Sequence, residues 1–313
     1  MLIFCRRIII NKPQFLKKKG PLLLACNHPN SFLDAAILAD LFEEPVFSLA
    51  RGDVFKKPFY RSILKGLKMF PVFRTSEGVQ NLGINYETFD ECKGVFRKNG
   101  IVLIFSEAKC INEWHLRPLR KGTARLSFSS WEENIALQVL PVGINYSSFR
   151  RFSKNVFINF GEVISKNDFD LKEADGRRNL AFNLNLKEQL HQLVFEIKKT
   201  DVQTQKKILE KKPSLLTRIF LFIPAGIGWL LHAPLYIPIK NFTYKKTITN
   251  DHYDSILVVL LLFIYPVYLV LVTLITVILT HNSCFLFLIL ALPFTAWAFV
   301  QLKPQLDKQP ARS

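Results

Sequence analysis

Residues 256–280 contain no charged side chain, and this run of 25 residues constrains the chain more than any other feature of its 313 residues. A transmembrane helix needs about 20 consecutive apolar residues, so the run is long enough to cross a bilayer. A second uncharged run, residues 284–300, follows after the short linker 281–283. Because only helices and closed barrels span lipid, the two runs predict a transmembrane helical hairpin. The alternative is a hairpin buried in a soluble protein, which the length of the first run disfavours.

Basic residues flank this hairpin on its outer ends, whereas the linker inside it is uncharged. Lys240, Lys245 and Lys246 precede the hairpin, and Lys303, Lys308 and Arg312 follow it. Loops rich in Lys and Arg stay on the cytosolic side of a membrane. We therefore expect an integral membrane protein whose large N-terminal domain lies on the cytosolic face.

A third apolar stretch, residues 215–240, contains Pro224, Gly226, Gly228, Pro234 and Pro238. Proline and glycine at this density interrupt a regular helix, so a broken or re-entrant segment is expected. The sequence thus predicts a folded domain over residues 1–200, a basic linker over 201–214, a membrane region over 215–303 and a basic tail over 304–313.

The net charge of +17 calls for an anionic partner, which is nucleic acid, an acidic lipid surface or a phosphorylated substrate. The chain has no recognisable nucleic-acid-binding motif and is tied to a membrane, so no nucleic-acid partner is expected. The five cysteines are scattered without a CxxC pair, and no cluster of metal ligands is visible, so no metal site is expected. The first ten residues, MLIFCRRIII, predict either an interfacial anchor or a buried first strand.

Short apolar runs alternate with stretches of helical length in the first 200 residues. The runs typical of strands are 22–26, 101–105, 136–144 and 156–160, and the stretches typical of helices are 33–43, 80–98, 121–131 and 177–199. This alternation predicts a layered α/β domain. The sequence has no GxGxxG, P-loop or HExxH motif, so it gives no support for a dinucleotide, nucleotide or zincin site.

A histidine and an aspartate follow the first of these apolar runs, in the segment from Asn27 and His28 to Asp34. A carboxylate at a helix start can hold an imidazole in one tautomer, so that its other nitrogen accepts a proton. A purely structural role for both residues is the alternative. The pair is therefore a candidate catalytic base and its orienting partner.

Charged residues gather after the later apolar runs. They are Arg74, Glu107, Lys109, Arg117, Arg120 and Lys121. Ligands bind beyond the carboxyl ends of strands in open α/β sheets, and guanidinium groups match phosphate oxygens, so this set predicts a phosphate-binding site. A solvated basic face or an anionic-lipid patch is the alternative.

Four blocks in this order resemble the glycerolipid acyltransferase family, which includes glycerol-3-phosphate and 1-acylglycerol-3-phosphate O-acyltransferases. The blocks are Asn27-His28 with Asp34, Phe70 to Arg74, Phe105-Ser-Glu107, and Leu140-Pro141-Val142. The resemblance implies an acyltransferase domain with a central β core flanked by helices. It also implies acyl transfer from acyl-CoA or acyl-carrier protein to a lipid hydroxyl, with no further cofactor.

The resemblance implies roles for the charged residues as well. His28, oriented by Asp34, would deprotonate the acceptor hydroxyl, which attacks the thioester directly. Arg74 with Lys121 and neighbouring cations would hold the acceptor phosphate. Glu107 would accept hydrogen bonds from acceptor hydroxyls or organise those cations.

The chain departs from the family pattern in three places. Five residues rather than four separate His28 from Asp34, Phe70 to Arg74 is one residue longer than usual, and the third block reads FSEAKC. Ala108 stands where a glycine is usual and disfavours a positive φ, so a different loop path is expected. These changes leave two alternatives: an acceptor without phosphate, such as an acylated amino acid, or a non-catalytic membrane protein that binds anionic lipid.

Overall fold

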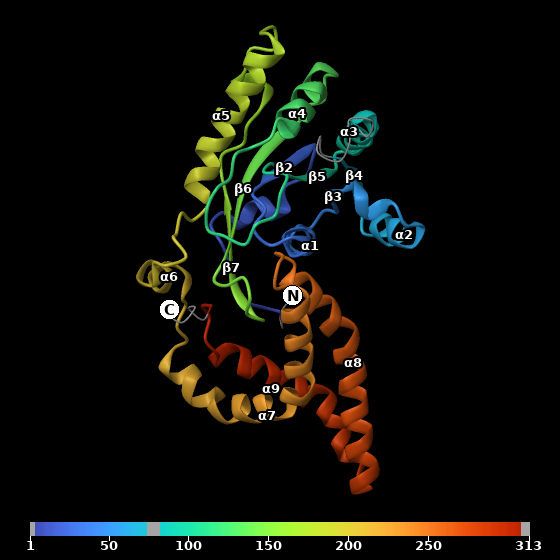
Figure 1. Cartoon of the computed structure of the whole chain (residues 1–313), viewed down its shortest axis with the longest axis vertical. Coiled ribbons are helices and arrows are strands. Elements are labelled where there is room, and N and C mark those ends of the chain that lie inside the picture. The colour runs from blue at the N-terminus through green and yellow to red at the C-terminus, as the bar shows by residue number, and fades with distance from the viewer. Residues whose placement is uncertain (1–3, 74–81, 308–313) are drawn as a thin grey trace. The chain divides into compact units, whose positions relative to one another are not determined.

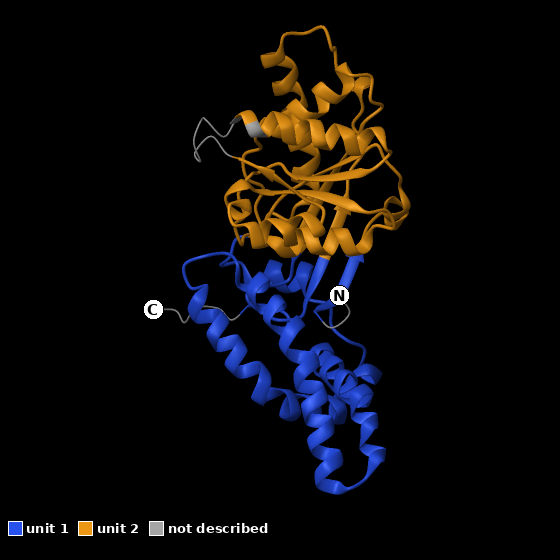
Figure 2. Cartoon of the chain, turned by 90° about the vertical axis from the view of Figure 1, so that its right-hand side faces the viewer, with its two compact units in different colours: residues 1–9, 146–156, 198–313 blue, residues 10–145, 157–197 orange. Residues whose placement is uncertain are grey.

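The computed structural model describes residues 4–73 and 82–307 and divides the chain into two compact units. Unit 2 comprises residues 10–145 and 157–197, and unit 1 comprises residues 1–9, 146–156 and 198–313 (Figure 2). Most of the sheet and its helices, which Figure 1 labels, belong to unit 2, and the apolar C-terminal helices belong to unit 1.

A seven-stranded sheet with the order β1-β7-β6-β2-β5-β3-β4 forms the centre of the fold. Its strands are β1 (Cys5–Ile10), β2 (Leu22–Cys26), β3 (Val46–Arg51), β4 (Met69–Val72), β5 (Ile101–Phe105), β6 (Gln138–Tyr146) and β7 (Lys154–Phe160). Strand β2 pairs in parallel with β5 and β6, and β3 pairs in parallel with β4 and β5. The sequence predicted either an interfacial anchor or a first strand for the N-terminal segment, and the structure has the strand, β1.

Helices cover the sheet in unit 2. They are α1 (Phe32–Leu41), α2 (Pro58–Gly66), α3 (Leu82–Arg97), α4 (Gly122–Glu132) and α5 (Asp175–Leu193), with short 3-10 turns at Pro13–Lys17, Gly52–Phe55 and Lys166–Asp168. All five residues of β2 are buried, as expected for a parallel strand covered on both faces. The predicted layered α/β fold is confirmed.

One hydrophobic core joins α3, α4 and α5 to the sheet. It includes Leu23, Ala25, Val102 and Ile104 from the strands and Phe96, Phe128, Trp131, Phe182 and Leu186 from the helices. Full burial of such a side chain contributes about 1.5–3 kcal/mol. This core fixes the carboxyl ends of β2 and β5, where the candidate site residues follow.

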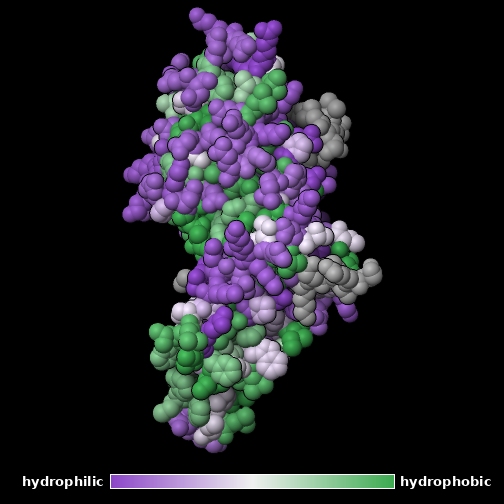
Figure 3. Space-filling model, turned by 90° about the vertical axis from the view of Figure 1, so that its left-hand side faces the viewer, coloured by the Kyte–Doolittle hydropathy of each residue, from purple (hydrophilic) through white to green (hydrophobic). Residues whose placement is uncertain are grey.

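Unit 1 contains α6 (Val202–Leu209), α7 (Leu215–Lys246), α8 (Tyr253–Thr280), a 3-10 turn (Ser283–Phe287) and α9 (Leu288–Leu302). Helix α6 lies within the stretch that the sequence predicted to be a linker. Three of these segments, Leu215–Lys246, Tyr253–Thr280 and Ser283–Leu302, are long and apolar enough to cross a membrane by length and composition. The surface that they form is largely hydrophobic (Figure 3).

Helix α7 differs from the expectation of a broken segment. The backbone stays helical through Pro224, Pro234 and Pro238, and the helix changes direction along its length (Figure 1). Each proline removes one backbone hydrogen bond and bends a helix without necessarily ending it. Gly228 permits the close approach of α9, because a Cβ there would lie 2.0 Å from the carbonyl oxygen of Thr295. The interruption predicted from sequence is therefore a bend.

The segments before and after α7 both contact the connection between β6 and β7, residues 146–156. The Asn155 side chain donates to the carbonyl of Leu209, shortly before α7 begins. Arg150 donates to the carbonyl of Thr247, just after α7 ends, at 3.4 Å. The chain thus leaves this connection before α7 and returns to it after α7.

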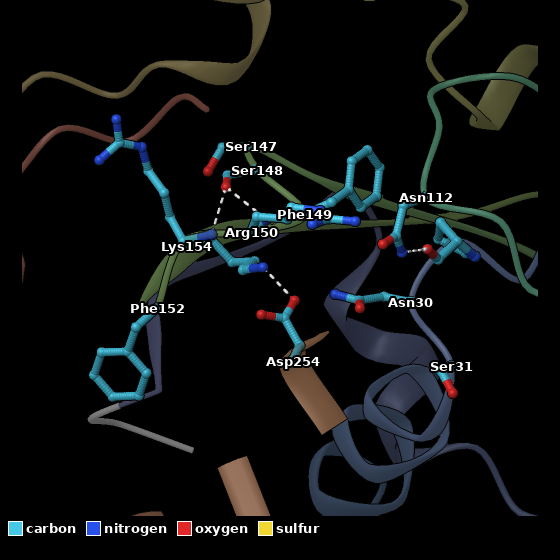
Figure 4. A network of polar contacts seen from close by, with 12 residues as sticks. Asn30, Ser31, Asn112, Ser147, Ser148, Phe149, Arg150, Phe152, Lys154 and Asp254 are labelled. Carbon is cyan, nitrogen blue, oxygen red and sulfur yellow. Dashed lines mark hydrogen bonds and ion pairs between the residues drawn. The ribbon is translucent and has the colours of Figure 1, made fainter. Parts of the chain in front are cut away.

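The same connection holds α8 and α9. The Lys154 ammonium group points to the Asp254 carboxylate in the first turn of α8, and both side chains are completely buried (Figure 4). Lys303, which follows α9, donates to the carbonyl of Phe152. Ser148 donates to Asp307, near the end of the described chain, at 2.5 Å.

Candidate active site

The imidazole of His28 and the carboxylate of Asp34 lie at the carboxyl end of β2. His28 Nδ1 is 2.9 Å from Asp34 Oδ2, and the backbone N–H of Asn30 donates to the same oxygen at 2.8 Å. An ionised carboxylate only accepts hydrogen bonds, so Nδ1 carries the proton in this arrangement. The opposite nitrogen, Nε2, then has its lone pair free to accept a proton.

The two side chains of this pair differ in their exposure to solvent. Asp34 is completely buried, whereas 17% of the His28 side chain is exposed. The imidazole also stacks on Phe105 at the end of β5, with ring centroids 3.8 Å apart. The carboxylate and the aromatic ring thus fix the orientation of an imidazole that a substrate can still reach.

Ser31 absorbs the additional residue between His28 and Asp34. It lies immediately before α1 and adopts φ 54° and ψ −137°, which is rare for a residue with a Cβ. The helix therefore starts late enough for Asp34, its third residue, to face back toward His28. The departure from the family spacing leaves the contact between the two side chains intact.

Glu107 joins two segments of the site through backbone hydrogen bonds. Its Oε2 accepts the N–H of His28 at 2.7 Å, and its Oε1 accepts the N–H of Arg117 at 2.7 Å. Burial raises the pKa of this carboxyl above its ordinary value, although both N–H groups and nearby His28 oppose that shift. Through these two hydrogen bonds, Glu107 organises the backbone around the imidazole.

The segment after Glu107 packs against the His28 loop. Ala108 takes φ 56°, so this alanine does adopt the left-handed conformation that the sequence led us not to expect. The Asn112 amide donates to the carbonyl of Pro29 at 2.7 Å (Figure 4). The N–H of Ser31 donates to the Cys110 sulfur at 3.0 Å. Nothing in the sequence pattern singled out Asn112.

Asn27 anchors the loop from the other side. Its side chain donates to the carbonyl of Ile144 in β6 at 3.0 Å and accepts the N–H of Ile144 at 2.7 Å. Cys26, the preceding residue, is fully buried, and burial together with the charge of Asp34 raises the pKa of its thiol well above the ordinary value. A thiol held in this protonated form is a poor nucleophile.

The predicted cations are only partly brought together. Lys109, Arg120 and Lys121 are exposed, and the described residues offer none of them an ion-pair partner. The Arg120 N–H donates to the carbonyl of Ser106 at 2.8 Å, which places this residue beside the end of β5. Arg117 pairs with Glu113 at 2.7 Å. Arg74 lies outside the described residues.

Metal ligands do not gather in the described part of the chain. No group of three or more His, Cys, Asp or Glu side chains there is arranged to hold a metal ion. The chemistry open to these residues is proton transfer at His28 beside a set of exposed cations.

Comparisons with known proteins place this site in a recognised domain. A family model described as acyltransferase matches residues 7–145, which include His28, Asp34 and Glu107. A search of curated proteins found no match. Among solved structures, the chain is similar to the crystal structure of the 1-acyl-sn-glycerophosphate acyltransferase PlsC from Thermotoga maritima. That similarity has 15% sequence identity and a TM-score of 0.44, over 63% of this chain and 76% of that chain.

Proposed function

We propose that the chain moves a fatty acyl group from a thioester donor to a lipid hydroxyl, because a family model described as acyltransferase matches residues 7–145. The donor is acyl-CoA or acyl-carrier protein, and the acceptor is glycerol-3-phosphate or 1-acylglycerol-3-phosphate. The observation that carries the proposal is the His28–Asp34 pair. It lies within the matched domain and leaves Nε2 of His28 available to accept a proton. No cofactor other than the acyl donor takes part.

His28 acts as general base and then as general acid. Nε2 takes the proton of the acceptor hydroxyl while the oxygen attacks the thioester carbonyl carbon, and the ion pair with Asp34 stabilises the imidazolium that forms. The carbon–sulfur bond then breaks, and the leaving thiolate receives the proton from Nε2. The products are an ester and a free thiol, and Asp34 stays ionised throughout.

Lys109, Arg120 and Lys121 support an acceptor that carries phosphate. They are exposed cations near the carboxyl end of β5 and the start of α4, with no carboxylate to neutralise them among the described residues. Arg and Lys bind phosphate oxygens through charge-assisted hydrogen bonds. Arg74 is assigned to the same phosphate through the family resemblance alone.

Acyl transfer in membranes containing the protein tests this function. Radiolabelled acyl-CoA and acyl-carrier protein are offered with glycerol-3-phosphate, with 1-acylglycerol-3-phosphate and with a lysolipid that lacks phosphate. We expect ester formation with a phosphate-bearing acceptor, its loss in His28→Ala, and its retention in the control His191→Ala, which removes an exposed imidazole from α5. Transfer that survives in His28→Ala contradicts the assigned base, and transfer to the phosphate-free lysolipid alone contradicts the assigned acceptor.

We further propose that α8 and α9 cross a membrane and that unit 2 lies on its cytosolic face. The lengths and composition of these helices support the crossing, and the basic residues at the outer ends of the hairpin support the orientation. Since the segments before and after α7 both contact the β6–β7 connection, at Leu209 and Thr247, we propose that α7 enters the bilayer and returns to the same side.

Cys284 provides a test of this orientation. It is an exposed free thiol in the 3-10 turn between α8 and α9. A membrane-impermeant maleimide added to intact cells should label it, and Cys284→Ser should abolish that labelling. Labelling that requires disrupted cells would place the turn on the cytosolic side and refute the orientation.

A further inference from the structure

Helix α2 exposes a hydrophobic face in unit 2. Phe59 and Ile63 in the helix and Leu67 directly after it follow one another at intervals of four residues, and Tyr60 lies beside them. Their exposed fractions are 70%, 45%, 50% and 50%, and none of the helix residues is buried. An amphipathic helix on a protein surface normally turns its apolar stripe toward the core. The stripe of α2 is turned away from it.

Basic side chains on the polar side of α2 face the rest of unit 2. Arg61 donates from Nε to the carbonyl of Phe55 at 3.1 Å. Arg61 and Lys65 line a hollow of about 480 Å³ together with aromatic side chains that include Phe55 and Phe70. The helix is thus attached through its basic side. A contiguous exposed apolar surface of this kind marks an interaction site.

Cations surround the exposed stripe. Lys56 and Lys57 precede the helix, Arg61 and Lys65 lie on its polar side, and Lys68 follows it. All five are exposed, and none forms an ion pair with the described residues. A short helix with aromatic and aliphatic residues on one side and Lys and Arg on the other is typical of a segment that lies in the surface of an anionic bilayer.

We propose that α2 is an interfacial helix that inserts Phe59, Ile63 and Leu67 into the surface of an anionic bilayer. Charge favours this partner over an apolar protein surface, because the basic residues beside the stripe match lipid phosphates. A bilayer is also the partner that the apolar helices α7 to α9 would bring to the chain. The contact holds unit 2 on the bilayer surface, and it does not depend on the acyl-transfer assignment.

Depth-dependent fluorescence quenching tests this contact in the full-length protein. In a Cys284→Ser background, Ile63→Cys places a thiol on the apolar stripe, and the matched control Ser62→Cys places one on the adjacent polar side. Each is labelled with an environment-sensitive fluorophore and reconstituted into vesicles of phosphatidylcholine and phosphatidylglycerol. The background protein without an introduced cysteine corrects for labelling of half-buried Cys110.

A lipid with a nitroxide high on its acyl chain should quench the label at residue 63 several-fold more than the label at residue 62. Equal quenching at the two positions would overturn the proposal. A label at residue 63 that is shielded from water but not quenched by the lipid would also overturn it, because protein would then cover the stripe. Unchanged quenching in vesicles of phosphatidylcholine alone would refute the anionic surface as the partner.

Discussion

Two completely buried carboxylates, Asp34 in unit 2 and Asp254 in unit 1, are alike in several respects. Each lies in the first turn of a helix, α1 or α8, where the helix dipole favours a negative charge. Each also contacts a basic side chain, which is His28 at 2.9 Å for Asp34 and Lys154 for Asp254. Burial and pairing alone therefore do not separate the two sites.

The basic partners separate them. Lys154 is completely buried, so no substrate reaches its pair with Asp254, whereas the His28 side chain is 17% exposed. A lysine paired with a carboxylate is also a fixed cation, while an imidazole can take up and release a proton near neutral pH. A titratable partner that is exposed on one side, more than a buried ion pair, therefore marks the candidate site for chemistry.

The comparison predicts that Asp34→Asn affects the reaction most strongly. The amide can donate to Nδ1, which moves the imidazole proton to Nε2 and removes the base. We expect kcat to fall by about 10²–10⁴, the usual contribution of general acid–base catalysis. Steady-state acyl transfer measures this, with thermal unfolding as the control for folding. A variant that keeps wild-type kcat would show that Asp34 does not orient a base.

Asp254→Asn should instead act on stability. It leaves the Lys154 ammonium group buried without a compensating charge, and breaking a buried pair in this way costs about 3–5 kcal/mol. Denaturant unfolding in detergent measures the loss, while kcat per folded molecule should stay unchanged. A loss of kcat in fully folded Asp254→Asn would contradict the assignment of Asp254 to stability alone.

The double variant Lys154→Met/Asp254→Leu sharpens the same test. It removes both charges together, and replacing a buried ion pair by apolar side chains is often neutral or stabilising. We expect its stability to return close to that of the wild type. If the double variant is as unstable as Asp254→Asn, the loss of stability does not come from the unpaired Lys154.

Glu107 is a third buried carboxylate, and it contacts backbone N–H groups in place of a basic side chain. Because burial raises its pKa above the ordinary 4.5, the folded state binds the proton more tightly than the unfolded state. The contribution of this group to stability therefore grows as the pH falls through the raised pKa toward 4.5. We therefore measure the free energy of unfolding of the wild type and of Glu107→Gln across this pH range. As the pH falls, the wild type should become more stable relative to Glu107→Gln. A difference independent of pH would contradict the raised pKa.

The fold could be predicted from sequence where the chain follows a single rule. The apolar runs 22–26 and 101–105 became β2 and β5 with the predicted ends, because buried parallel strands are continuously apolar. Helix α7 could not be predicted in this way. Its prolines forecast a break, but the packing of Gly228 against α9 shows that tertiary contacts stabilise this helix as well.

The candidate site, like the fold, could be predicted from the sequence only in part. The residue types and their order identified His28 and Asp34, and the structure brings these two side chains together. The route by which Ser31 absorbs one additional residue depends on a rare backbone conformation, which a sequence pattern does not reveal. Glu107 was expected to meet substrate hydroxyls or cations, but its visible partners are two N–H groups that become neighbours only when the loops fold.

The smallest predicted effect concerns Ala108, at the start of the loop that packs on His28. Its φ of 56° is a left-handed conformation that costs a residue with a Cβ about 1–2 kcal/mol. Ala108→Gly relieves this strain, although the greater freedom of glycine in the unfolded chain offsets about 0.4–1 kcal/mol of the gain. We expect a net stabilisation of about 1 kcal/mol or less with unchanged acyl transfer, measured by denaturant unfolding.

Ala181→Gly, at an exposed position inside helix α5, is the matched control and should lose about 0.5–1 kcal/mol. The opposite signs of the two changes separate backbone strain from a general effect of glycine. If both variants are destabilised alike, Ala108 is not strained, and the loop beside His28 takes its path without stored conformational energy.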